Sequence, residues 1–161
     1  MGTLCDSGLL KPFRALLAVA VVAHCLCAAP TLTFSTFLGA DFGEVANGVA
    51  LDPEGNVYIV GQTRDMPALP GSISLPGSPS FDIFVAKFNP DGDRLLYLAL
   101  FGGTAREQGT AIAVDDNGAA YVTGWAFSAD FPTTPGSVQP NFGGGTRDAF
   151  VAKLTPDGSA L

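Results

Sequence analysis

The sequence predicts an all-β fold assembled from short antiparallel strands, and three observations support this prediction. Glycine and proline supply 20 and 12 of the 161 residues, a density that long helices do not tolerate. A sequence pattern recurs at a spacing of 63 to 66 residues. Within each copy, short segments rich in Val, Ile, Phe and Tyr alternate with turn residues. The length suits one ordinary domain.

The recurring pattern is an internal repeat. Residues 48–61 match residues 111–124, and the identical pairs include Asp52 and Asp115, Gly55 and Gly118, Tyr58 and Tyr121, and Gly61 and Gly124. Farther along, residues 82–87 and 148–153 share the pattern Asp-x-Phe-Val-Ala-Lys. We therefore divide residues 30–161 into copies at about 31–81 and 82–147 and a truncated third copy from 148.

Four segments of the second copy have strand character and are bounded by Gly, Asp or Asn: Ile83–Phe88, Leu95–Phe101, Thr110–Val114 and Ala119–Gly124. The links 89–93 and 115–118 place glycine where a tight hairpin needs a positive φ. We expect these four strands to form one antiparallel meander. Such a meander has two faces to cover, so the copies should stack face to face as the blades of a β-propeller.

The motifs also resemble a known family. Residues 113–124 read A-V-D-D-N-G-A-A-Y-V-T-G, residues 131–140 read F-P-T-T-P-G-S-V-Q-P, and residues 148–158 read D-A-F-V-A-K-L-T-P-D-G. This combination resembles the SBBP family, a bacterial seven-bladed β-propeller repeat, over residues 31–161, with a departure in the loop 65–80. The resemblance implies a propeller blade in exported or surface proteins and no family-wide catalytic activity.

The repeat predicts an incomplete propeller of about two blades. It amounts to one four-stranded copy, three strands before it and one strand after it, whereas a propeller closes with about four to eight blades. We expect the remaining blades to come from a longer chain, which is the preferred interpretation, or from self-association of several copies.

The N-terminal residues 1–29 are typical of a secretory signal peptide. Lys11 and Arg14 precede an apolar run at 15–27, and the small residues Ala28 and Ala29 follow it. The run is short for a membrane-spanning helix, which needs about 20 residues, so a retained anchor is the less favoured alternative. The pattern predicts a secreted, periplasmic or cell-surface protein.

Cleavage of this segment would remove every cysteine and the single histidine of the chain, namely Cys5, His24, Cys25 and Cys27. The mature protein would then lack the side chains for disulfides, cysteine-rich zinc sites and Ser-His-Asp or Cys-His catalysis. Its formal net charge would change from −7 to −8, because Asp6, Lys11 and Arg14 are lost. Such a charge argues against nucleic acid as a partner.

No residue is predicted to be catalytic, to bind a cofactor or to ligate a metal. The acidic turns at 52–55, 91–93, 115–117 and 157–158 could supply oxygen ligands to calcium, but none follows the EF-hand spacing, and hairpin chemistry explains them. Lys87 and Lys153 each follow an aspartate, Asp82 or Asp148, by five residues. We interpret these residues as a repeated structural ion pair or as solvated charges.

Four aromatic residues in the long loop of the second copy could contact a ligand: Trp125, Phe127, Phe131 and Phe142. The alternative is that they pack one blade against the next. The sequence thus favours a non-enzymatic exported module that binds a protein or a glycan. A carboxylate-dependent polysaccharide lyase or hydrolase on a propeller scaffold is the rival hypothesis, and a structural spacer without a ligand is the third.

Overall fold

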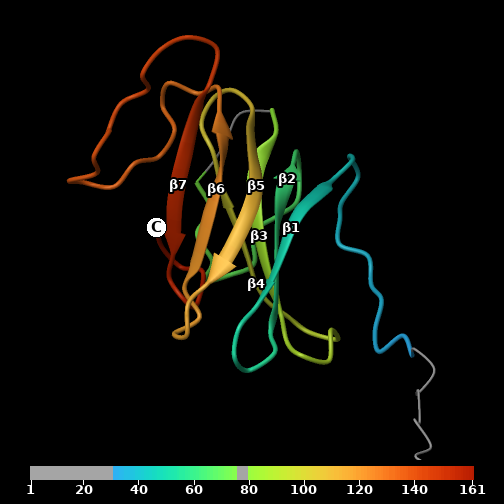
Figure 1. The fold of residues 1–161 in the computed structure, drawn as a ribbon. Coiled ribbons are helices and arrows are strands. Elements are labelled where there is room, and N and C mark those ends of the chain that lie inside the picture. Colours follow the sequence, from blue (N-terminus) through green and yellow to red (C-terminus); the bar gives the residue numbers. More distant parts are fainter. Residues whose placement is uncertain (1–30, 76–79) are drawn as a thin grey trace, which may run out of the picture. The chain divides into compact units, whose positions relative to one another are not determined.

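The computed structural model describes residues 31–75 and 80–161. The predicted signal segment 1–29 lies outside the described residues. Within the described residues, seven strands form two antiparallel sheets (Figure 1). The first sheet contains β1 to β4 in sequence order, and the second contains β5 to β7. The strands span β1 (Val45–Leu51), β2 (Val57–Thr63), β3 (Asp82–Phe88), β4 (Leu95–Phe101), β5 (Glu107–Val114), β6 (Ala120–Ala126) and β7 (Asp148–Leu154).

The tight turns form as the sequence predicts. In the β1–β2 turn, Gly55 has a φ of 84°, and in the β5–β6 turn, Gly118 has a φ of 82°. The N–H of each glycine donates to the carbonyl of the aspartate that opens the turn, Asp52 or Asp115, at 3.0 and 2.9 Å. Glycine adopts this left-handed conformation without the penalty that a Cβ would impose, so the repeated Asp-x-x-Gly pattern fixes both hairpins.

The expectation that the four strands of residues 82–124 form one sheet is wrong. The sheet boundary falls between β4 and β5, so the first sheet combines two strands from each of two repeat copies. The long link at 64–81 connects β2 and β3, which pair antiparallel in one sheet, whereas the short link at 102–106 passes between sheets. Comparing the sequence with itself gives the period of a repeat but not the point at which each blade begins.

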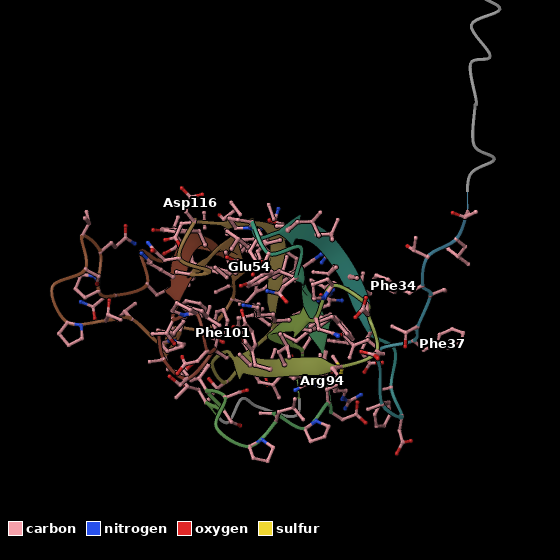
Figure 2. The ribbon with its side chains drawn as sticks, turned by 90° about the horizontal axis from the view of Figure 1, so that it is seen from below. Phe34, Phe37, Glu54, Arg94, Phe101 and Asp116 are labelled. Carbon is pink, nitrogen blue, oxygen red and sulfur yellow. The ribbon has the colours of Figure 1, made fainter. Side chains whose placement is uncertain are left out.

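The repeat also predicts three strands before β3, but the structure describes two. Residues 32–38 correspond in the repeat to β4, which is held by pairing with β3. Residues 32–38 pair with no described strand, and the segment carries no strand hydrogen bonding. Figure 2 shows Phe34 and Phe37 on this segment, at the side of the molecule.

The two sheets pack face to face around one apolar cluster. Alternate residues of the first sheet, including Tyr58, Val60 and Val85, meet Val122 and Leu154 of the second sheet. All five are buried, and burying a side chain of this size stabilises the fold by about 1.5 to 3 kcal/mol. The interface between the sheets is therefore the principal core of the described chain.

Glycine lets β5 approach β2 of the first sheet at this interface. A Cβ on Gly109 would lie 2.5 Å from Cγ2 of Val60, a distance that packed atoms do not tolerate. The carbonyl of Gly109 accepts a hydrogen bond of 2.8 Å from the Asn47 side chain, so the two sheets are also joined by a polar contact.

The other face of the first sheet carries a second cluster. Phe84, Ala86 and Leu98 point away from the second sheet and are covered by Met66, with Leu38 packed beside them. Both faces of the first sheet are therefore covered.

Candidate functional site

The same three polar side chains recur at one end of each sheet. In the first sheet, the carboxylate of Asp52 accepts a hydrogen bond of 3.1 Å from the Tyr58 hydroxyl and lies 3.3 Å from Nζ of Lys87. In the second sheet, the corresponding distances from Asp115 to Tyr121 and Lys153 are 3.2 and 3.4 Å. We call the two groups the first and second Asp-Tyr-Lys clusters.

This arrangement corrects the predicted pairing of Lys87 with Asp82. Side chains alternate between the two faces of a strand, so residues separated by five positions point to opposite faces. Lys87 instead lies directly across from Tyr58 on the neighbouring strand, and both side chains reach Asp52. The same reasoning applies to Lys153 and Asp148, because Lys153 pairs with Asp115.

The two clusters differ in how they are covered. Tyr58 is completely buried, and its hydroxyl also lies 3.0 Å from the carbonyl oxygen of Gly118 in the second sheet. Tyr121 is 39% exposed. The second sheet therefore covers the first cluster, while no described residue covers the second cluster in the same way.

The different burial of the two clusters changes what determines the pKa values of their residues. Burial disfavours the ionised form of Asp52, but hydrogen bonds from Asn56, Lys87 and Tyr58 outweigh it and hold the pKa of Asp52 below its usual value. Burial, followed by the hydrogen bond to Asp52, raises the pKa of the Tyr58 hydroxyl. The backbone N–H of Ala119 is the main cause of the lowered pKa of Asp115. Both aspartates are therefore ionised partners for a lysine.

A cavity of about 940 Å³ lies along β7, at the outer edge of the second sheet. Its wall includes side chains from both faces of β7, among them Phe150 and Val151, and residues of the β6–β7 loop, among them Phe131 and Phe142. Among the described residues, β7 pairs with β6 on one side and with no strand on the other. Figure 1 shows the long β6–β7 loop projecting beyond this edge.

In the first sheet, β4 occupies the corresponding place. It pairs with β3, the counterpart of β7, and the β2–β3 loop binds its other edge. The N–H groups of Leu69 and Leu75 donate to the carbonyls of Leu98 and Leu100 at 3.1 and 3.2 Å, and the N–H of Leu100 donates to Ile73 at 3.0 Å. The cavity thus lies where a fourth strand of the second sheet would lie, between β7 and the β6–β7 loop.

The four aromatic residues singled out in the sequence separate into two places. Trp125 belongs to β6 rather than to the loop, and it packs edge to face against Phe127 at 5.2 Å between ring centroids. The guanidinium carbons of Arg106 and Arg147 lie 5.4 and 5.2 Å from the Trp125 ring centroid.

The other two aromatic residues lie at the cavity. Phe131 packs against Phe150 at 4.8 Å and against Phe101 of the first sheet at 6.3 Å, so it also contributes to packing between sheets. Phe142 lines the cavity.

Sequence reasoning missed a buried carboxyl pair at the link between the sheets. Glu107 is fully buried and accepts hydrogen bonds from the Ser128 hydroxyl and, at 3.0 Å, from the N–H of Gly103. A Cβ on Gly102 would lie 2.2 Å from Asp82 Oδ1 and 2.8 Å from Glu107 Oε2, so both carboxyls lie against this glycine. Burial, and then the charge of Glu107, raises the pKa of Asp82 to about 6.

The repeat contains a feature from which the structural role of Glu107 could have been predicted. Glu44 occupies the same repeat position, and its carboxylate accepts a hydrogen bond of 3.3 Å from the N–H of Ala40. The glutamate five residues after Gly39 and the one five residues after Gly102 therefore each bond a backbone N–H of the turn that leads into the next strand.

Within residues 31–75 and 80–161, no three acidic, cysteine or histidine side chains gather in a way that could hold a metal ion. The described part of the chain also has no helix long and apolar enough to span a membrane.

Comparison with known proteins supports the repeat. No curated protein matches the chain. Residues 34–64 match the family model of SBBP, described as a β-propeller repeat, and this stretch includes β1 and β2. The match confirms the resemblance to this family over residues 34–64, and the two antiparallel sheets are consistent with propeller blades that do not close into a ring. Residues 34–64 therefore carry an SBBP β-propeller repeat.

Proposed function

We propose that this chain is an exported, non-enzymatic interaction module that binds an extended polypeptide segment along the free edge of β7. The observation that carries the proposal is the cavity beside β7, which has the place that β4 takes in the first sheet. A bound segment would pair with the backbone of β7 and lie against the β6–β7 loop.

The chemistry of the cavity favours a polypeptide. An open strand edge presents unpaired N–H and C=O groups at the spacing of another strand, which main-chain hydrogen bonding can use. Phe131, Phe142 and Phe150 add apolar surface that can receive alternate side chains of the bound segment. Such an edge provides affinity through backbone pairing and selectivity through side-chain packing.

A glycan with acidic groups is the second candidate ligand. Trp125 offers an aromatic face, and Arg106 and Arg147 bring two cations to it. These side chains could stack on a sugar ring and bind a carboxylate. The cavity favours the polypeptide as the first candidate because Trp125 does not belong to its wall.

The positions of the carboxylates support binding rather than hydrolysis. Asp115 and Asp148 both line the cavity. Asp148 is the first residue of β7, and Asp115 pairs with Lys153, which lies five residues farther along the same strand. At a rise of about 3.3 Å per residue, the two carboxylates are separated by roughly 17 Å. Glycoside hydrolysis needs a pair about 5 to 10 Å apart. The rival lyase or hydrolase would therefore need acids from elsewhere.

The proposed export rests on residues 1–29, with their two basic residues, apolar run and small residues. Expression of the whole chain in an exporting bacterial host tests it. A product outside the cytoplasm that begins near residue 30 supports export, and an uncleaved cytoplasmic product contradicts it.

Binding is tested with a labelled peptide that carries residues 94–103, the β4 sequence, flanked by added lysines for solubility. We expect saturable binding by fluorescence anisotropy, and no binding of a scrambled peptide. Phe142→Asp should weaken binding at least tenfold, because it places a charge in the cavity wall. Phe127→Ala is the matched control, because Phe127 belongs to the same loop but packs on Trp125.

Equal loss of binding in both variants, or no binding by an unaltered chain that runs as a single copy, would contradict the proposed edge site. Turnover of a polysaccharide that one Asp→Asn substitution abolishes would overturn the non-enzymatic assignment.

A further inference from the structure

The chain contains a second segment with the sequence character of β4. Residues 32–39 align with residues 95–102 at the spacing of the repeat, with Leu32 on Leu95, Phe34 on Tyr97, Leu38 on Phe101 and Gly39 on Gly102. The correspondence continues to Glu44 and Glu107, which fasten the turn that follows. Residues 32–38 thus have the residue types that a fourth strand needs, including the aromatic and aliphatic side chains that β4 turns toward the core.

In the structure this segment is unpaired and carries exposed apolar side chains. Phe37 is fully exposed, and Leu32 is 83% exposed. Large apolar side chains that are grouped and exposed mark a surface that binds something. The two parts are therefore complementary. The cavity beside β7 lies where a strand of this type would pair, and residues 32–38 have the sequence of such a strand but pair with no described strand.

The two parts belong to opposite sides of the described unit. Leu38 packs on the face of the first sheet that points away from the second sheet, whereas the cavity borders β7 of the second sheet. The order of the strands along the chain leads to the same placement. In the chain, β4 completes one sheet and leads through residues 102–106 into β5 of the next. By the same rule, residues 32–38 complete a sheet that precedes β1, and this sheet is not part of the described chain.

We propose that residues 32–38 of one copy of this chain insert beside β7 of a second copy, as the fourth strand of its second sheet. This names the partner of the edge site and so rests on the proposed function. The first sheet of the inserting copy would then lie against the outer face of the second sheet of its neighbour. The contact is head to tail, and it repeats until the assembly closes or extends.

The residues on the outer face of the second sheet suit contact with the first sheet of a second copy. It carries Tyr121, Lys153 and Val151, of which Val151 is 81% exposed. Their counterparts in the first sheet, Tyr58, Lys87 and Val85, lie beneath the second sheet within the same chain. In the assembly, Gly55 of the inserting copy would offer its carbonyl to Tyr121, as Gly118 offers its carbonyl to Tyr58.

Paired differences in side-chain size also agree with the contact. Within the chain, Gln62 of the first sheet accepts a hydrogen bond from Arg106. The repeat places the larger Trp125 at the position of Gln62 and the smaller Gly43 at the position of Arg106. Between copies, a tryptophan would therefore meet a glycine, so the gain in volume on one side is matched by a loss on the other.

The test measures the mass of the exported product by light scattering during size exclusion. We expect the unaltered chain to form assemblies of two or more copies. The double variant S35P/F37D alters exposed positions of residues 32–38 and should run as a single copy, since proline removes a strand donor. Phe142→Asp should also run as a single copy. Phe42→Asp is the matched control, because Phe42 is exposed but follows the inserting segment.

Mixing the two defective chains gives the decisive result. S35P/F37D keeps a working edge and Phe142→Asp keeps a working segment, so one head-to-tail contact can form and the mixture should contain a one-to-one pair. Circular dichroism confirms that each variant retains its β structure.

A single-copy unaltered chain that still binds the residue 94–103 peptide would overturn this inference while leaving the edge site standing. An unaltered chain that neither assembles nor binds the peptide would remove both. Assemblies that persist in S35P/F37D would place the contact elsewhere and also contradict the inference.

Discussion

The first and second sheets carry the same Asp-Tyr-Lys cluster in different surroundings. The side chains of Lys87 and Asp52 are 13% and 1% exposed, whereas those of Lys153 and Asp115 are 54% and 28% exposed. The residues and the distances are nearly the same, so the difference lies in what covers them. The comparison shows that the first cluster is an interior contact between blades and that the second presents the same chemistry at an uncovered surface.

The largest expected difference in stability between the two clusters arises when their tyrosines are replaced. Tyr58→Ala should destabilise the fold by about 3 to 5 kcal/mol, because it removes a fully buried ring. Tyr121→Ala should cost less than about 1 kcal/mol. Urea unfolding of both variants on the S35P/F37D background, where the second sheet stays uncovered, measures the difference. Equal costs would show that the second cluster is as well packed as the first.

The aspartates should follow the same order with smaller values. Asp52→Asn weakens the contacts with Lys87 and Tyr58 in a buried site and should cost about 2 kcal/mol in the free energy of unfolding. Asp115→Asn should leave the unfolding midpoint close to that of its parent, because solvent replaces the lost contacts. A midpoint change in Asp115→Asn as large as that in Asp52→Asn would contradict the comparison.

The buried carboxyls at the link between the sheets give a smaller effect that depends on pH. The pKa of Asp82 is raised from 3.8 to about 6, so the folded chain holds this proton more tightly than the unfolded chain. Its contribution to stability is present below about pH 4 and is lost as the pH rises to about 6. Solvent screening reduces the expected loss to about 1 kcal/mol.

Urea unfolding at several pH values checks this loss. Asp82→Asn should flatten the profile between pH 4 and 6. A profile that Asp82→Asn does not alter would assign the titration to another group.

The strands and hairpins could be predicted because their signals are local. β4 begins and ends at the predicted residues, Leu95 and Phe101, since turn residues bound it on both sides. The glycines of the hairpins have the predicted positive φ. These features depend on a few neighbouring residues and on the conformational freedom of glycine.

The grouping of strands into sheets could not be predicted in the same way. The long β2–β3 link resembles a boundary between repeat copies, yet it joins two neighbours of one sheet, and the boundary lies at the short link 102–106. Lys87 similarly reaches Asp52 across a strand pair rather than Asp82 along its own strand. Both outcomes depend on which strands pair, a non-local choice that the residue pattern leaves open.

The candidate site is harder still to foresee. The cavity beside β7 exists because a strand type present in the first sheet has no counterpart in the described second sheet, and only the paired register displays this. Phe131 and Phe142 were recognised in the sequence as an aromatic group with Trp125, but the fold sends Trp125 to the strand β6 and the other two to the cavity wall.

Hydrogen exchange along β7 tests most directly whether its free edge is the place of a fourth strand. The measurement compares the S35P/F37D chain with and without the peptide of residues 94–103. Added peptide should slow exchange of backbone amides within 148–154 and leave the already paired amides of β3 unchanged. Unchanged exchange in β7 under saturating peptide, or protection that appears on another element instead, would contradict the account.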